Sequence, residues 1–119
     1  MGNVLNGSKG LFFVDFDDML TGPVVQDIWL LTPGVDQKAR AFRESLLEGY
    51  ESLRDFNRSE LKLVESLRSM RFVHFAAWIG KRIDDPYFKK TFTEYGTWAY
   101  WDELVRDLEA QLPLIRESL

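Results

Sequence analysis

Two side chains that carry oxygen ligands, Asn3 and Asp15, flank a stretch that the sequence predicts to be a β-hairpin. Apolar, β-prone residues at 4–5 and 11–14 enclose the turn signal NGSKG at 6–10. Because a hairpin folds back on itself, the amide of Asn3 and the carboxylate of Asp15 are expected to converge. Mg²⁺ prefers oxygen ligands and often takes only one or two from protein, beside water and phosphate.

Three carboxylates, Asp15, Asp17 and Asp18, follow within four residues. Their mutual repulsion favours a cation or a basic partner nearby. A solvent-exposed acidic loop is the alternative, since water tolerates this repulsion. The residue types alone leave both interpretations open.

The order of several short motifs resembles the aminoglycoside phosphotransferase and choline kinase-like superfamily. Residues 2–5 (GNVL) resemble the end of its catalytic motif, and residues 13–18 (FVDFDD) resemble its later metal-binding strand. Gly22-Pro23 and residues 26–31 (QDIWLL) are closest to the stress response kinase A branch, which consists of kinase-like serine/threonine phosphotransferases. The resemblance continues through 49–51, 66–71, 85–88 and 100–101, and reaches about Leu112.

This resemblance implies that Asn3 and Asp15 are Mg²⁺ ligands and that Asp17 is a candidate contact to a second ion. It also implies that Asp27 is a buried aspartate that braces the catalytic loop through hydrogen bonds to its backbone. In the family motif the catalytic aspartate precedes the asparagine by five residues, a position upstream of Met1. The 119 residues also contain no glycine-rich phosphate loop before a strand.

The resemblance therefore predicts the C-terminal lobe of a Mg-ATP-dependent phosphotransferase that acts on a protein hydroxyl or a small alcohol. Phosphoryl transfer needs a positioned nucleotide and an oriented nucleophile. We expect this chain to be inactive alone and ATP-Mg to bind only in a complete parent. The alternative is a non-catalytic helical interaction module that forms a homodimer through apolar surface left bare in so small a domain.

The composition is that of a globular chain, with 45% hydrophobic and 29% charged residues. A net charge of −4 and a pI near 5.0 argue against nucleic acid as a partner. The absence of cysteine excludes disulfides and zinc–thiolate sites. The longest apolar stretch, 72–80, is too short to span a membrane, and a cytoplasmic location is expected.

The expected fold is mainly α: an N-terminal hairpin and a bundle of about four helices, resembling the C-terminal lobe of a kinase-like fold. Residues 1–119 are expected to form one partial domain, with the metal-ligand segment in 1–22 and the helical part in 23–119. Helices are predicted from Pro23 to Leu31, from Asp36 to about 54, from Asn57 to about 83, and from Thr97 until Pro113 ends or kinks the last one. Residues 88–96 are expected to be a connector.

The third predicted helix is nearly all apolar between 72 and 79. This pattern favours a position in the centre of the bundle, with the single histidine, His74, in the core. The tryptophans at 78, 98 and 101 are at helical spacing, which favours core packing over a ligand pocket.

Overall fold

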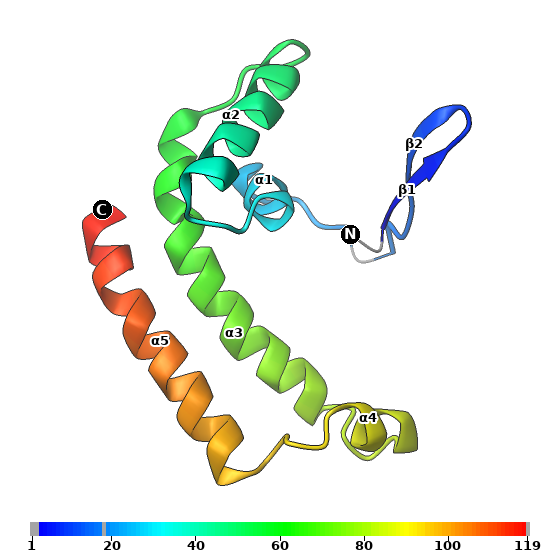
Figure 1. Ribbon diagram of the computed structural model, residues 1–119, viewed down its shortest axis with the longest axis vertical. Coiled ribbons are helices and arrows are strands. Elements are labelled where there is room, and N and C mark those ends of the chain that lie inside the picture. Colours follow the sequence, from blue (N-terminus) through cyan, green and yellow to red (C-terminus); the bar gives the residue numbers. More distant parts are fainter. Residues whose placement is uncertain (1–2, 18, 119) are drawn as a thin grey trace. The chain divides into compact units, whose positions relative to one another are not determined.

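The computed structural model describes residues 3–17 and 19–118, and the chain divides into two compact units, Met1–Asn57 and Arg58–Leu119. The first unit contains β1 (Val4–Gly7), β2 (Gly10–Phe13), α1 (Val25–Leu31) and α2 (Gln37–Glu51) (Figure 1). The second contains the 3₁₀ helix η1 (Arg58–Leu63), α3 (Val64–Gly80), α4 (Pro86–Thr91) and α5 (Trp98–Ser118). The predicted fold class, mainly helical after an N-terminal hairpin, is confirmed.

β1 and β2 form an antiparallel hairpin in which Val4 lies opposite Phe13 and Gly7 lies opposite Gly10. Gly10 has a φ of +118°, a conformation that residues with a Cβ atom rarely adopt. A Cβ atom at Gly7 would lie 2.9 Å from the ring of Phe12. The glycines of the turn motif therefore fit the backbone conformation and the close packing that this turn requires.

The segment from Pro23 to α2 follows its local signals closely. The N–H of Gln26 donates to the carbonyl of Pro23 at 3.1 Å, and α1 begins at Val25. Asp36 is the predicted cap of α2, because its carboxylate accepts a hydrogen bond from the N–H of Ala39 at 2.7 Å. The helix ends at Glu51, slightly earlier than predicted.

Arg43 on α2 holds the connector between α1 and α2. Its guanidinium donates to the carbonyl oxygens of Thr32 and Gly34, both at 3.0 Å, and to the Thr32 hydroxyl at 3.2 Å. Thr32 is buried, with 2% of its surface exposed. These bonds satisfy polar groups that would be costly to bury unpaired.

In the second unit, α3 packs against α5, which runs antiparallel to it (Figure 1). Ala76 and Ile79 of α3 are buried, but Val73 is 53% exposed and His74 is also exposed. The prediction that this helix runs through a core containing His74 was therefore wrong. The physical reason is that two paired helices cover only the facing side of each, whereas the apolar run surrounds the whole helix.

Residues 86–91 form the short helix α4, where the sequence predicted the start of a connector at 88. Asp85 caps it by accepting a hydrogen bond from the N–H of Tyr87 at 2.7 Å, and Pro86 occupies the first helical turn. The helix places Phe88 against Trp78, with ring centroids 5.1 Å apart. Trp78 is thus packed, as predicted.

The last helix, α5, begins after Thr97, whose hydroxyl accepts a hydrogen bond from the N–H of Tyr100 at 3.2 Å. Trp101 contacts Tyr100, but Trp98 is 84% exposed, so core packing was wrong for Trp98. The helix continues through Pro113 to Ser118 instead of ending at the proline. None of the helices in the described part of the chain is long and apolar enough to cross a membrane.

Candidate metal site at the open end of the hairpin

The open end of the hairpin brings Asn3 and Asp15 together. The side-chain amide of Asn3 donates a hydrogen bond to a carboxylate oxygen of Asp15 at 2.9 Å. The N–H of Val14 donates to the carbonyl of Asn3 at 3.1 Å, so the strand pairing extends one residue beyond β1 and β2. The convergence expected from the turn signal is confirmed for these two side chains.

The backbone of Asp15 makes this contact possible. Asn3 and Val14 are opposite each other in the continued register, so strand alternation would direct the next side chain, that of Asp15, to the other face. Asp15 instead has a φ of +67°, the one positive φ outside glycine among the described residues. This left-handed conformation breaks the alternation and turns the carboxylate toward Asn3.

A left-handed conformation costs a residue with a side chain roughly 1–3 kcal/mol. Aspartate tolerates it better than most residues, because its short polar side chain forms local hydrogen bonds. Sequence reasoning did not identify this conformation at Asp15. The available signal was weak: an aspartate at the end of a strand is among the residues enriched in this region.

The donor chemistry of the pair fits Mg²⁺. Neighbouring ligands in an octahedral Mg²⁺ site, each about 2.1 Å from the ion, lie about 3.0 Å apart. The amide nitrogen of Asn3 is 2.9 Å from the carboxylate oxygen of Asp15, and a half-turn of the amide about its Cβ–Cγ bond exchanges that nitrogen for the amide oxygen. Two oxygen ligands would then be at the separation that the ion requires.

The described residues alone do not supply enough ligands to surround a metal ion. Within residues 3–17 and 19–118 there is no group of three or more His, Cys, Asp or Glu side chains that could hold an ion. Mg²⁺ commonly takes one or two protein ligands and completes its shell with water and phosphate oxygens. The pair therefore fits Mg²⁺ bound together with a phosphate-bearing ligand, and not a structural zinc site.

The other residues that the resemblance implies are either exposed or outside the described part of the chain. Asp17 lies in the exposed loop after β2, where the N–H of Met19 bonds to the carbonyl of Phe16 at 3.1 Å. Asp18, the third carboxylate, and Gly2 of the first motif lie outside the described residues. Asp27 is in the first turn of α1 with an exposed side chain, whereas the resemblance implied a buried one.

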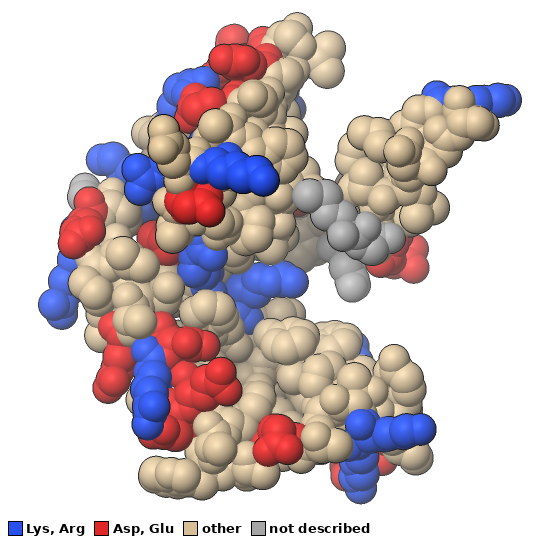
Figure 2. Space-filling view, in the orientation of Figure 1, with Lys and Arg blue, Asp and Glu red and all other residues tan. Residues whose placement is uncertain are grey.

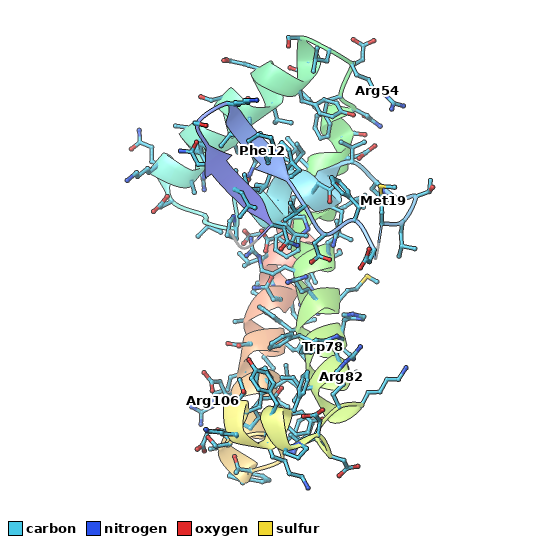
Figure 3. The ribbon with its side chains drawn as sticks, turned by 90° about the vertical axis from the view of Figure 1, so that its right-hand side faces the viewer. Phe12, Met19, Arg54, Trp78, Arg82 and Arg106 are labelled. Atoms are coloured by element: carbon cyan, nitrogen blue, oxygen red, sulfur yellow. The ribbon has the colours of Figure 1, made fainter. Side chains whose placement is uncertain are left out.

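An arginine–tryptophan contact at the end of α3 is a feature that the sequence reasoning missed. The guanidinium of Arg82 lies 4.7 Å from the ring centroid of Trp78, and it also donates to the carbonyl of Trp78 at 3.3 Å (Figure 3). The i,i+4 spacing of the two residues was the available signal.

Comparison with known proteins relates this chain to stress response kinases. It is 36% identical over 116 residues to stress response kinase A of Salmonella choleraesuis, and 41% identical over 100 residues to stress response kinase A of Escherichia coli K12. It is also 36% identical over 116 residues to the serine/threonine protein kinase RdoA of Salmonella typhimurium. The first match covers 98% of this chain and 35% of the relative, and the Escherichia coli match covers 84% and 30%.

The chain thus spans about a third of the length of the curated relatives that it matches. No protein-family model matches it, and no solved structure does. The similarity to stress response kinases that the motifs indicated is confirmed, and it extends over nearly the whole chain.

Proposed function

We propose that this chain is the metal-binding and helical part of a Mg-ATP phosphotransferase, corresponding to the C-terminal lobe of a protein in the aminoglycoside phosphotransferase and choline kinase-like superfamily. The observation that carries the proposal is the pairing of Asn3 and Asp15 at 2.9 Å across the open end of the hairpin. A relative is named as a serine/threonine protein kinase, which favours a protein hydroxyl over a small alcohol as the acceptor.

In this function Asn3 and Asp15 hold Mg²⁺, and Asp17 is a candidate contact to a second ion. Bound Mg²⁺ supplies charge neutralisation for the phosphate oxygens. The hairpin holds the two ligands at a fixed separation, and the left-handed backbone of Asp15 aims its carboxylate at the same point as the Asn3 amide. The proposed role of Asp27 is the bracing of the loop that carries the catalytic base.

Two ligands alone position neither a nucleotide nor a nucleophile, and positioning supplies most of the catalysis in this reaction class. We therefore expect the chain by itself to bind ATP weakly and to transfer no phosphoryl group. We expect the nucleotide cradle and the base to lie in the part of the relatives outside the match.

A chimera tests the proposal. The matched 116-residue segment of the Salmonella choleraesuis kinase is replaced by this chain, and ATP-dependent phosphorylation is measured. We expect activity in the chimera and a loss of about a hundredfold or more for Asp15→Asn, because a catalytic metal supplies several kcal/mol. The matched control is Asp107→Asn, which removes an exposed carboxylate from α5 and should leave the rate unchanged.

Circular dichroism of each chimera establishes that it is folded before rates are compared. Full activity of the folded Asp15→Asn chimera would remove the metal-ligand role. An inactive but folded parent chimera that binds no Mg-ATP would count against the phosphotransferase assignment itself.

Exposed apolar side chains favour a second candidate, the non-catalytic interaction module. On α3, Met70 is 66% exposed and Val73 is 53% exposed, and the exposed surface of the hairpin is apolar as well. Monomeric proteins rarely leave contiguous apolar surface of this kind in water. Sedimentation of the chain alone separates the candidates: a stable dimer together with an inactive chimera would support the module.

A further inference from the structure

The hairpin carries apolar side chains on both of its faces. Strand alternation and the observed register place Val4, Leu11 and Phe13 on one face. They place Leu5 and Phe12 on the other, together with Val14 in the continued pairing. Leu11 and Phe13 are 63% and 61% exposed, and Leu5 and Phe12 are 50% and 49% exposed. Within the first unit, neither face of the hairpin is covered by the described residues.

This pattern differs from that of a hairpin built to lie on a protein surface. A sheet with one solvated face alternates apolar and polar residues, whereas strands that are apolar throughout are typical of sheets covered on both faces. The only charged side chain between residues 3 and 14 is Lys9, in the turn, and Figure 2 shows the hairpin as largely uncharged surface. A two-stranded hairpin without a cover is also marginally stable in water.

We propose that the hairpin inserts into an apolar cleft of the polypeptide that corresponds to the remaining two thirds of a stress response kinase, so that both faces are covered. This inference rests on the proposed function. The relatives match 98% of this chain, yet the matched part is only 35% of their length. In the relatives, the part outside the match is therefore about twice as long as the matched part. That length is enough to cover both faces of the equivalent hairpin.

The insertion also explains the position of the candidate metal pair. Asn3 lies on the same face as Leu5 and Phe12, because residues two apart on a strand share a face. Docking of that face brings the Asn3 amide and the Asp15 carboxylate to the edge of the buried surface. The partner polypeptide can then add the nucleotide and its phosphates to the two ligands.

A second copy of this chain fits the hairpin less well. A two-fold symmetric contact uses the same patch on both partners. Two hairpins that meet in this way cover one face each and leave the opposite apolar face in water. Only a partner with a concave surface, or with elements on both sides, covers residues such as Leu11 and Phe12 at once.

The test uses the residues of the Salmonella choleraesuis kinase outside the matched segment, expressed as a separate polypeptide and mixed with this chain. Calorimetry measures binding, and hydrogen exchange measures protection of the hairpin amides. We expect binding, and at least a tenfold slowing of exchange in residues 4–13. Leu11→Lys and Phe12→Lys, one on each face, should each weaken binding tenfold or more. Leu53→Lys, at a side chain that is 91% exposed in the turn after α2, is the control and should bind normally.

The covalent chimera provides a second measurement if the separate polypeptide does not fold. In that protein, lysine at position 11 or 12 should lower the unfolding temperature, and Leu53→Lys should not. An unchanged unfolding temperature for both hairpin variants would overturn the insertion. So would an effect at only one face, or a dimer of this chain that Phe12→Lys disrupts while the partner polypeptide does not bind.

The outcome for the hairpin is separable from the outcome for the metal site. Asp15→Asn should leave the affinity for the partner polypeptide unchanged, because the carboxylate lies beyond the apolar residues. Binding of the partner polypeptide without phosphoryl transfer would contradict the proposed function and support the insertion of the hairpin. An active chimera whose unfolding temperature is unchanged by both hairpin variants would support the proposed function and contradict the insertion.

Discussion

Replacement of Asp15 by asparagine separates the metal-binding role of this residue from its structural role. Asparagine accepts the left-handed backbone conformation as readily as aspartate does, and its amide oxygen can still accept the hydrogen bond from Asn3. Because the bond that changes is exposed, we expect the free energy of unfolding to change by less than about 0.5 kcal/mol. The fold should therefore be preserved.

The effect on metal binding should be much larger. A unit charge about 2.1 Å from a divalent ion contributes about 4 kcal/mol even at the dielectric constant of bulk water. The dipole of the replacing amide recovers part of this energy. A net loss of about 1.4 kcal/mol or more, which is at least tenfold in the dissociation constant for Mg²⁺, is the conservative expectation.

The assay is a Mg²⁺ titration of the isotope-labelled chimera in the presence of a non-hydrolysable ATP analogue, with the side-chain amide resonance of Asn3 as the reporter. In the unsubstituted chimera this resonance should shift as Mg²⁺ replaces the hydrogen bond to Asp15. In Asp15→Asn the midpoint should move to at least tenfold higher Mg²⁺, and in Asp107→Asn it should not move. Equal midpoints for the unsubstituted chimera and Asp15→Asn would refute the reasoning, as would an Asn3 resonance that does not respond to Mg²⁺.

Two further predictions concern contacts that hold the helical parts together. Arg43→Lys should lower the free energy of unfolding by about 1–3 kcal/mol, measured by urea denaturation, because one ammonium cannot replace two guanidinium nitrogens, of which Nε donates to the Thr32 hydroxyl and Nη2 donates to the carbonyl oxygens of Thr32 and Gly34. An unchanged urea midpoint would mean that the connector does not depend on this pair of donor nitrogens. Gly80→Ala should destabilise the chain by about 1–2 kcal/mol, since its Cβ would overlap the hydroxyl of Tyr95, and Tyr95→Phe should restore most of the loss in thermal denaturation. Failure of that rescue would place the strain elsewhere.

Features that depend on a few neighbouring residues could be predicted from the sequence. The turn at 6–10, the Asp36 cap and the helix start after Thr97 all follow from side chains that bond to nearby backbone. The nearness of residues 3 and 15 along the backbone also belongs here, because a hairpin with a known turn fixes which residues lie at its open end. The contact between their side chains depends in addition on the left-handed backbone of Asp15. The start of α4 had the same kind of signal, because Asp85 caps the helix and Pro86 occupies its first turn. The helix was not predicted, because residues 88–96 were interpreted as a connector.

The exposure of individual side chains could not be predicted in the same way. Between 72 and 79 almost every residue is apolar, so the helical period does not identify which face is buried. The pairing of α3 with α5 decided it, burying Ala76 and leaving Val73 and His74 exposed. Trp98 is exposed for a related reason, because it is the first residue of α5 and only part of that helix surface faces α3.

The sequence by itself therefore determined the hairpin, the helical character of the rest and the nearness of residues 3 and 15 at the open end of the hairpin. The structure showed the left-handed backbone of Asp15, for which the local signal was weak, and tertiary structure decided the exposure of both faces of the hairpin. The physical reason is the sequence distance over which each interaction acts. Turns and caps are bonds between neighbours along the chain, whereas burial depends on which distant surface is available to cover an apolar face.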